Sequence, residues 1–246
     1  MSNDTAGQII NDALVEVGLS SSTDPFADSD SNVQQMCTFL KTLGREITHQ
    51  HNWTILRKEY TFVTVQGTSS YAMPSDFHEM YDQTGWNRTN RLPLGGPLSA
   101  QEWQYLKSRL AGVVFTVLFR PMDGMMYLYP DTNTPGGYTI AYEYKSDGCW
   151  KVAVGGGNYV YRDYPSDSSD ICLFDTLMMS RGLKLAWLKA HAFDTTSAQQ
   201  DFEQALMFTK GQDSFVPVLN LTRPTALRGV DVMLGQQSVP ITGFGT

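Results

Sequence analysis

Apolar residues in the first 51 positions recur at the spacing of α-helices. Over residues 5–18 they fall at i, i+3, i+4 and i+7 on one face, with Thr5 as the N-cap and Gly18 as the stop. A second stripe of the same period predicts a helix over residues 31–51, with Gly44 in its interior. Glycine inside a helix costs roughly 1 kcal/mol relative to alanine, and one use for Gly44 is the close approach of another helix.

The apolar period changes from helical to alternating within residues 51–77. Residues 60–65 alternate as strands do, residues 67–70 supply a turn, and Tyr71, Met73 and Pro74 enter a second extended piece. Because Pro74 has no N–H for a ladder, we expect it at a strand end or edge. We interpret Trp53, Tyr71, Pro74, Asp76 and Phe77 as the junction between a helical and a β part, with Trp53 packed where the two meet.

Residues 58–165 alternate short apolar runs with turn signals. The runs on either side of Asp123 and Gly124 predict a hairpin, and residues 138–144 predict a further strand. Ser99 and Glu102 form the capping-box pattern of a short helix over residues 99–111. Residues 148–165 are interpreted as loop or weak strand, which gives a small antiparallel β domain of about five or six strands.

Helical spacing returns at Ser168 and predicts two further helices. One runs to about Phe193 with Ser168, Ser169 or Asp170 as its cap, which leaves Asp175 inside the helix without an explanation. The other begins at Thr195 or Thr196 and ends at Gly211. The loop that joins them is so short that we expect the two helices to be antiparallel neighbours.

Together these elements predict an α+β fold: an antiparallel four-helix bundle interrupted by an inserted small antiparallel β domain, with an extended C-terminal arm. The predicted divisions are residues 1–53 for the first two helices, 54–167 for the β insertion, 168–212 for the last two helices and 213–246 for the arm. The arm contains prolines and glycines but is too apolar for a solvated tail, so we expect it to lie on a surface. Its apolar residues are Phe215, Val216, Val218, Leu219, Leu221, Leu227, Val230, Val232 and Leu234.

Composition narrows the possible functions. The chain has 246 residues and a formal net charge of −7, without a basic stripe, which argues against tight nucleic-acid binding. Three widely spaced cysteines favour a reducing compartment. The N-terminus lacks the pattern of a signal peptide, and no apolar run approaches the roughly 18–20 residues of a membrane span.

Candidate chemistry is sparse. His49 and His51 point to different sides of a helix and do not suit one metal ion. His78, Glu79, Asp82 and Asp76 form a polar group that we interpret as turn and cap residues. We therefore predict no catalytic, cofactor or metal site.

The aromatic residues of the β region leave one alternative open, a carbohydrate-binding or tail-fibre-type module; otherwise such a run forms a half-buried sheet face or a subunit interface. The residues concerned are Tyr127, Tyr129, Tyr138, Tyr142, Tyr144, Trp150, Tyr159, Tyr161 and Tyr164.

The junction motif resembles a known family. Trp53, the alternating residues 60–65 and the string from Tyr71 through Pro74 and Asp76 to Phe77 are similar to head-to-tail adaptors of tailed bacteriophages, also called connectors or tail tubular proteins A in short-tailed phages.

The resemblance implies a non-enzymatic virion protein, assembled in the host bacterial cytoplasm, that forms a homo-oligomeric ring, usually a dodecamer. The ring would lie between the portal protein and the tail nozzle protein, with the arm reaching the portal. DNA would pass through its channel without specific binding, because an acidic lumen has the same sign of charge as the duplex.

Overall fold

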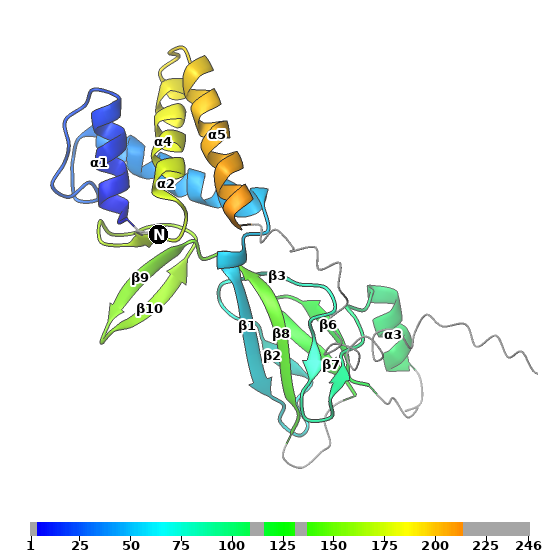
Figure 1. The fold of residues 1–246 in the computed structure, drawn as a ribbon. Helices are drawn as coiled ribbons and strands as arrows, with labels where there is room; N and C mark the ends of the chain where they lie inside the picture. The colour runs from blue at the N-terminus through cyan, green and yellow to red at the C-terminus, as the bar shows by residue number, and fades with distance from the viewer. Residues whose placement is uncertain (1–3, 109–115, 131–136, 214–246) are drawn as a thin grey trace, which may run out of the picture. The chain divides into compact units, whose positions relative to one another are not determined.

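The computed structural model describes residues 4–108, 116–130 and 137–213 (Figure 1). The elements along the chain change from helices to strands and back to helices. The helices are α1 (Ala6–Glu16), α2 (Ser31–Gln50), the short 3-10 helix η1 (Thr54–Leu56), α3 (Ala100–Ser108), α4 (Thr176–Ala190) and α5 (Thr196–Asp213).

Three antiparallel sheets hold the strands of the described residues. The largest has the order β1-β8-β4-β5, with β3 also paired to β8, and the others have the orders β2-β7-β6 and β10-β9-β11. The bounds are β1 (Arg57–Val63), β2 (Ser70–Ala72), β3 (Phe77–Met80), β4 (Trp86–Asn87), β5 (Leu92–Pro93), β6 (Leu118–Met122), β7 (Met125–Tyr129), β8 (Thr139–Ser146), β9 (Trp150–Gly155), β10 (Asn158–Arg162) and β11 (Ile171–Cys172).

Local capping signals explain where several helices begin. Thr5 and Gln8 form a reciprocal capping box on α1, and Asp30 accepts from the backbone N–H of Asn32 at the start of α2. The box predicted for α3 is also present: the Ser99 backbone N–H donates to the Glu102 carboxylate at 2.8 Å, and the Glu102 N–H donates to the Ser99 hydroxyl at 3.3 Å.

The predicted start of the third long helix was wrong. Ile171 and Cys172 pair with β9 as β11, and α4 begins only at Thr176. Its N-cap is Asp175, whose carboxylate accepts from the Met178 N–H at 3.0 Å. The Asp170 carboxylate caps a turn before β11 instead, where it accepts from the backbone N–H groups of Ser166 and Asp167.

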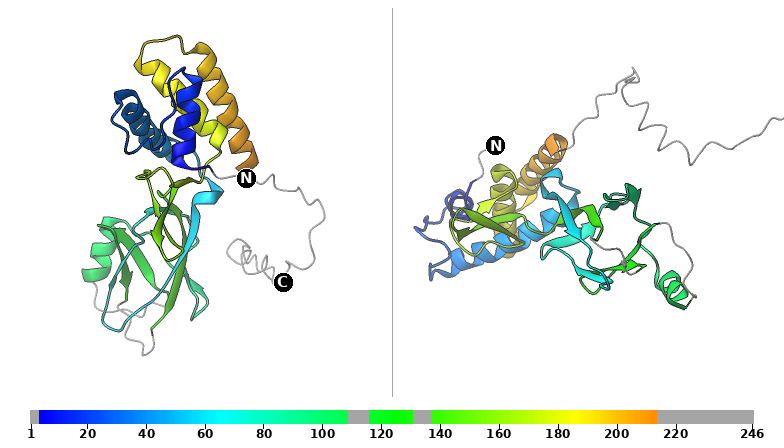
Figure 2. Two further views of the ribbon diagram at one scale, coloured as in Figure 1. Left: turned by 90° about the vertical axis from the view of Figure 1, so that its left-hand side faces the viewer. Right: turned by 90° about the horizontal axis from the view of Figure 1, so that it is seen from below.

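The four long helices do not form the predicted bundle. Helix α4 packs against α1, α2 and α5, but α2 runs across the other three rather than alongside them (Figures 1 and 2). Helix α5 buries only Ala198 and Ala205, while Met207 and Phe208 are each 68% exposed, so it covers one side of α4 without closing a ring of helices. The helical period of a sequence identifies the apolar face of a helix but not the element that packs against that face. The prediction of a four-helix bundle failed for this reason.

The sheet β10-β9-β11 packs against the helices where the predicted bundle would have placed another helix. Cys149, Trp150 and Cys172, from β9, β11 and the turn before β9, belong to the same buried cluster as the apolar faces of α1, α2 and α4. A side chain at position 44 would place its Cβ 3.0 Å from Nε1 of Trp150 and 3.3 Å from Sγ of Cys149. Gly44 therefore allows Trp150 of β9, and not another helix, to approach α2 closely.

The β region is larger than the five or six strands predicted, although parts of it agree. Strands β6 and β7 form the hairpin predicted through Asp123 and Gly124. Tyr138, Ile140, Tyr142 and Tyr144 lie in a second cluster of buried or half-buried side chains, as their alternation predicted. Residues 148–165, interpreted as loop or weak strand, form the hairpin β9–β10. The predicted arm residues from Phe215 to Leu234 lie outside the described part of the chain.

Candidate functional site at the junction of helices and sheets

Trp53 fixes the direction in which the chain leaves α2. Its side chain is 1% exposed, and its indole Nε1–H donates to the backbone oxygen of Ile47 at 2.7 Å. The ring contacts Phe174, which precedes α4, with 5.2 Å between the ring centroids. One residue therefore connects the end of α2, the start of η1 and the segment that enters α4.

The end of α5 is held at the same place. The Asp213 carboxylate accepts from the backbone N–H and the hydroxyl of Thr54, the first residue of η1. His51 Nε2 lies 3.5 Å from a carboxylate oxygen of Asp213. The last described residue of the chain is therefore bound to the segment that leads from the helices into β1.

Tyr71 closes the turn between β1 and β2. The Val65 N–H donates to the phenol oxygen of Tyr71 at 2.8 Å, and the Tyr71 hydroxyl donates to the backbone oxygen of Thr68 at 2.9 Å. Pro74 follows β2, an edge strand of its sheet, and its carbonyl accepts from the Phe77 N–H at 3.0 Å.

Asp76 is the polar centre of the junction. Its carboxylate accepts from Lys58 Nζ at 2.6 Å, from the Ser146 hydroxyl at 2.6 Å and from the Tyr144 hydroxyl at 2.9 Å. Burial by itself raises the pKa of Asp76, but these hydrogen bonds and the charge of Lys58 outweigh it and hold the pKa below its ordinary value. Lys58 Nζ also lies 3.5 Å from the centroid of the Tyr161 ring on β10.

Phe77 continues this junction into the core of the large sheet. Its ring stacks on Tyr144 with 5.7 Å between centroids, and it meets Tyr142 edge-on. Burial, followed by the hydrogen bond to Asp76, raises the pKa of Tyr144, so its hydroxyl stays protonated and serves as a donor.

The partners of Asp76 were missed from the sequence, because they come from distant strands. Tyr144 and Ser146 belong to β8, and Lys58 belongs to β1. The sequence did contain one indication. Tyr142, Tyr144 and Ser146 are alternate residues of one strand and face the same side of the sheet, so the polar Ser146 falls at an inward position. Lys145 was also missed; it is buried, with Nζ 3.5 Å from Asn52 Oδ1 and 3.9 Å from Glu79 Oε1.

Comparison with known families decides the assignment. Residues 4–219 match the SU10 adaptor protein family. The chain belongs to this family. The match spans nearly the whole chain and confirms the resemblance to phage head-to-tail adaptors, so the protein is a structural component of a bacteriophage virion. No curated protein matches the sequence. Among the described residues, none of the adaptor's helices has the length and apolarity to cross a membrane.

The aromatic residues of the adaptor do not line one open surface. Tyr142, Tyr144 and Trp150 are buried, Tyr159 and Tyr164 are exposed, and the others are intermediate. The three buried rings belong to the two hydrophobic clusters, so their faces are not available to a sugar. The structure therefore gives no support to the carbohydrate-binding alternative.

Several large apolar side chains of the helical part are exposed. They include Val15 at 62% on α1, Leu177 at 52% on α4, Met207 and Phe208 at 68% on α5, and Phe193 at 56% in the loop between α4 and α5. A groove of about 640 Å³ runs between α1 and α4, and both Val15 and Leu177 line it. Its other lining residues include the acidic side chains of Asp12, Glu16 and Asp175.

Proposed function

We propose that this adaptor forms a closed homo-oligomeric ring, a dodecamer, between the portal and the tail nozzle of a tailed bacteriophage, and that the ring surrounds part of the DNA ejection channel. The observation that carries the proposal is the match of residues 4–219 to a phage adaptor family. The protein acts as a structural part of the virion without catalysis or a cofactor, and it assembles in the host bacterial cytoplasm.

The exposed apolar residues of the helices support a subunit interface. Val15 on α1 and Leu177 on α4 line one groove, and Met207 and Phe208 are neighbours on α5. Exposed apolar side chains that lie together in this way are typical of surfaces that a partner covers. In a ring, a neighbouring copy covers the groove between α1 and α4 of each subunit. The ring thereby buries side chains that the single chain leaves in water.

The net charge of −7 supports passage of DNA without binding. Tight binding to a duplex depends on Lys and Arg residues that neutralise phosphates and release counterions. A channel wall of the same sign as DNA gives no such contacts, so the duplex slides past it.

The C-terminal arm, which follows Asp213, is the proposed contact with the portal. Its sequence carries the apolar residues Phe215, Val216, Val218, Leu219, Leu221, Leu227, Val230, Val232 and Leu234. Asp213, the residue before the arm, is itself held in place, because its carboxylate is bound to Thr54 and His51. The junction residues Trp53, Tyr71, Pro74, Asp76 and Phe77 then set the orientation of the helices relative to the β region.

Deletion of the arm tests this assignment. A protein that ends at Asp213 keeps the contacts of α5 with η1, so we expect it to fold but not to dock on the portal protein of the same phage in sedimentation or pull-down assays. A full-length variant with Val216, Val218, Leu219 and Leu221 changed to serine is the matched control for chain length, and we expect it to dock as weakly as the deletion. Full docking by the shortened protein would show that the arm is not the portal contact.

A further inference from the structure

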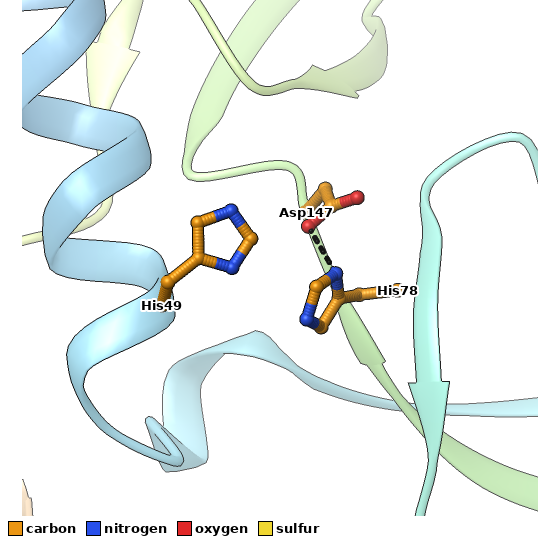
Figure 3. A group of neighbouring side chains, drawn as sticks. All are labelled: His49, His78 and Asp147. Carbon is orange, nitrogen blue, oxygen red and sulfur yellow. Dashed lines mark ion pairs between the residues drawn. The ribbon is translucent and has the colours of Figure 1, made fainter.

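Three potential metal-ligand side chains meet beside the Asp76 centre, and they come from three separate elements. His49 lies on the last turn of α2, His78 on β3, and Asp147 in the residue after β8 (Figure 3). One ligand atom from each lies within 4.8 Å of the others. The group is independent of the proposed ring and of the arm.

The backbone presents His78 in an unusual way. Strands β3 and β8 pair Phe77 with Ser146 and Glu79 with Lys145, so His78 is the extra residue of a β-bulge. A bulge of this kind leaves one residue outside the ladder and turns its side chain in a new direction. Here the imidazole turns toward Asp147, with 3.0 Å between Nδ1 and a carboxylate oxygen.

The other two side chains are positioned by the same junction. Asp147 is held by its backbone, since its N–H donates to the Asp76 carbonyl at 2.9 Å. His49 faces His78 across a gap, with ring centroids 4.8 Å apart and planes inclined by 53°. His49 is exposed, and the side chains of His78 and Asp147 are 31% and 38% exposed, so an ion can enter directly from solvent.

The donor set determines the class of ion. Two imidazoles and one carboxylate suit Zn²⁺ and neighbouring first-row divalent metals, whereas Mg²⁺ and Ca²⁺ prefer oxygen ligands. Ligand atoms at ordinary zinc distances lie about 3.4 Å apart in a tetrahedral site. Rotation of the exposed His49 ring brings its nitrogen closer to the ligand atoms of His78 and Asp147, which now lie within 4.8 Å of it. Water completes the coordination of the ion.

We propose that His49, His78 and Asp147 bind one divalent transition-metal ion of the Zn²⁺ class, which joins the end of α2 to the β3–β8 edge of the large sheet. The ion connects α2 and β3, whose ligands His49 and His78 are 29 residues apart in the sequence, and takes its third ligand, Asp147, from the residue after β8. Thiolates do not compete for it, because Cys37, Cys149 and Cys172 are buried, and burial raises the pKa of the Cys149 thiol to about 12.

Titration of the tag-free full-length protein with Zn²⁺ and with Co²⁺ tests the proposal by calorimetry and visible absorption. We expect one ion per chain, and a loss of affinity of at least about tenfold in each of His49→Ala and His78→Ala. His191→Gln, which changes a histidine stacked on Trp187 at the end of α4, should bind as the wild type does. Mg²⁺ should give no saturable heat.

Thermal unfolding provides a readout that separates binding from folding. With Zn²⁺ at about one hundred times its Kd, the wild-type Tm should rise by roughly 5–10 °C, and the rise should vanish in His49→Ala and His78→Ala. In EDTA, the same variants should unfold within about 2 °C of the wild type, since His49 and His78 lie at the surface. No saturable Zn²⁺ binding by the wild type, or unchanged affinity in both variants, would overturn the site.

Discussion

The two hydrophobic clusters of the adaptor are built differently. The helical cluster joins α1, α2 and α4 to β9 and β11, and most of its members, such as Ile9, Leu40 and Leu183, are fully buried. The sheet cluster has fewer buried members, and half-buried rings such as Tyr60 and Phe62 pack at its margin. A pocket of about 280 Å³ opens beside it, lined by residues that include Met80, Phe119 and Met126.

This difference indicates that the two parts obtain their stability in different ways. The helical part depends on close packing, so loss of volume or addition of a methyl group is costly there. The sheet part has fewer buried side chains and relies more on the charged hydrogen bonds around Asp76, which attach it to the chain that leaves α2. The following substitutions test that contrast, beginning with the largest expected effect.

Replacing Trp53 by alanine should lower the free energy of unfolding by about 3–5 kcal/mol, because the fully buried ring leaves a cavity beside Phe174 and the Ile47 carbonyl loses its donor. Urea denaturation measures the loss. Trp86→Ala is the matched control: that ring is 43% exposed on β4, and its loss should cost about 1 kcal/mol or less. Equal costs at the two positions would contradict the assignment of Trp53 to the packed region.

Replacing Asp76 by asparagine should cost about 2–3 kcal/mol at pH 7, because Lys58 loses its counter-charge and two hydroxyl donors lose a charged acceptor. Because the folded-state pKa of Asp76 lies below its usual value near 3.8, this stabilisation is present above that pH and is lost as the pH falls through the folded pKa. The difference in free energy of unfolding between the wild type and Asp76→Asn, measured by denaturation from pH 7 to pH 3, should therefore become smaller below about pH 4.

An exposed pair provides the control for that experiment. Glu59 accepts from Arg88 at 2.8 Å, and both side chains are about half exposed. Glu59→Gln should change the free energy of unfolding far less than Asp76→Asn does, because solvent screens the exposed pair. If the difference in free energy of unfolding between the wild type and Asp76→Asn stays constant down to pH 3, the Asp76 charge does not stabilise the junction.

Replacing Gly44 by alanine should destabilise the protein by about 1–2 kcal/mol, even though alanine favours helix by roughly 1 kcal/mol. The new Cβ would meet Trp150 and Cys149, both fully buried, at 3.0 and 3.3 Å. Thermal unfolding of the variant measures the outcome. A gain in stability would show that β9 can withdraw from α2 at little cost.

Replacing Asp175 by alanine should cost about 1 kcal/mol, because α4 loses the acceptor for the Met178 N–H. Ser169→Ala, at one of the caps expected from the sequence, should cost less than about 0.5 kcal/mol, since Ser169 precedes β11 and lies outside α4. Chemical denaturation of the two variants side by side distinguishes the observed helix start from the predicted one.

The helices and hairpins were predictable where the signal is local. The stripes of α1 and α2, the Ser99–Glu102 capping box and the turn at Asp123–Gly124 are each contained in a few neighbouring residues. The arrangement of helices was not predictable, because the apolar face of α2 is the same whether a helix or Trp150 of β9 covers it. Ile171 continued the helical stripe in sequence, but pairing with Lys151 makes it a strand.

The candidate site also has a part that was predictable from local sequence and a part that was not. The burial of Trp53 followed from its position between two periods of the sequence. The grouping of Asp76 with Lys58, Tyr144 and Ser146, and of His78 with His49 and Asp147, depends on strand pairing across about seventy residues. Local sequence contains the members of these groups but not the register that brings them together.

The most direct test of the proposed adaptor role is the molar mass of the full-length protein by size-exclusion chromatography with light scattering, alone and mixed with the portal protein of the same phage. We expect the mixture to elute as a single complex whose mass equals the portal plus one ring of adaptor subunits. The adaptor alone can remain a monomer if the ring closes only on the portal. An adaptor that stays monomeric both alone and with the portal would contradict the proposed ring.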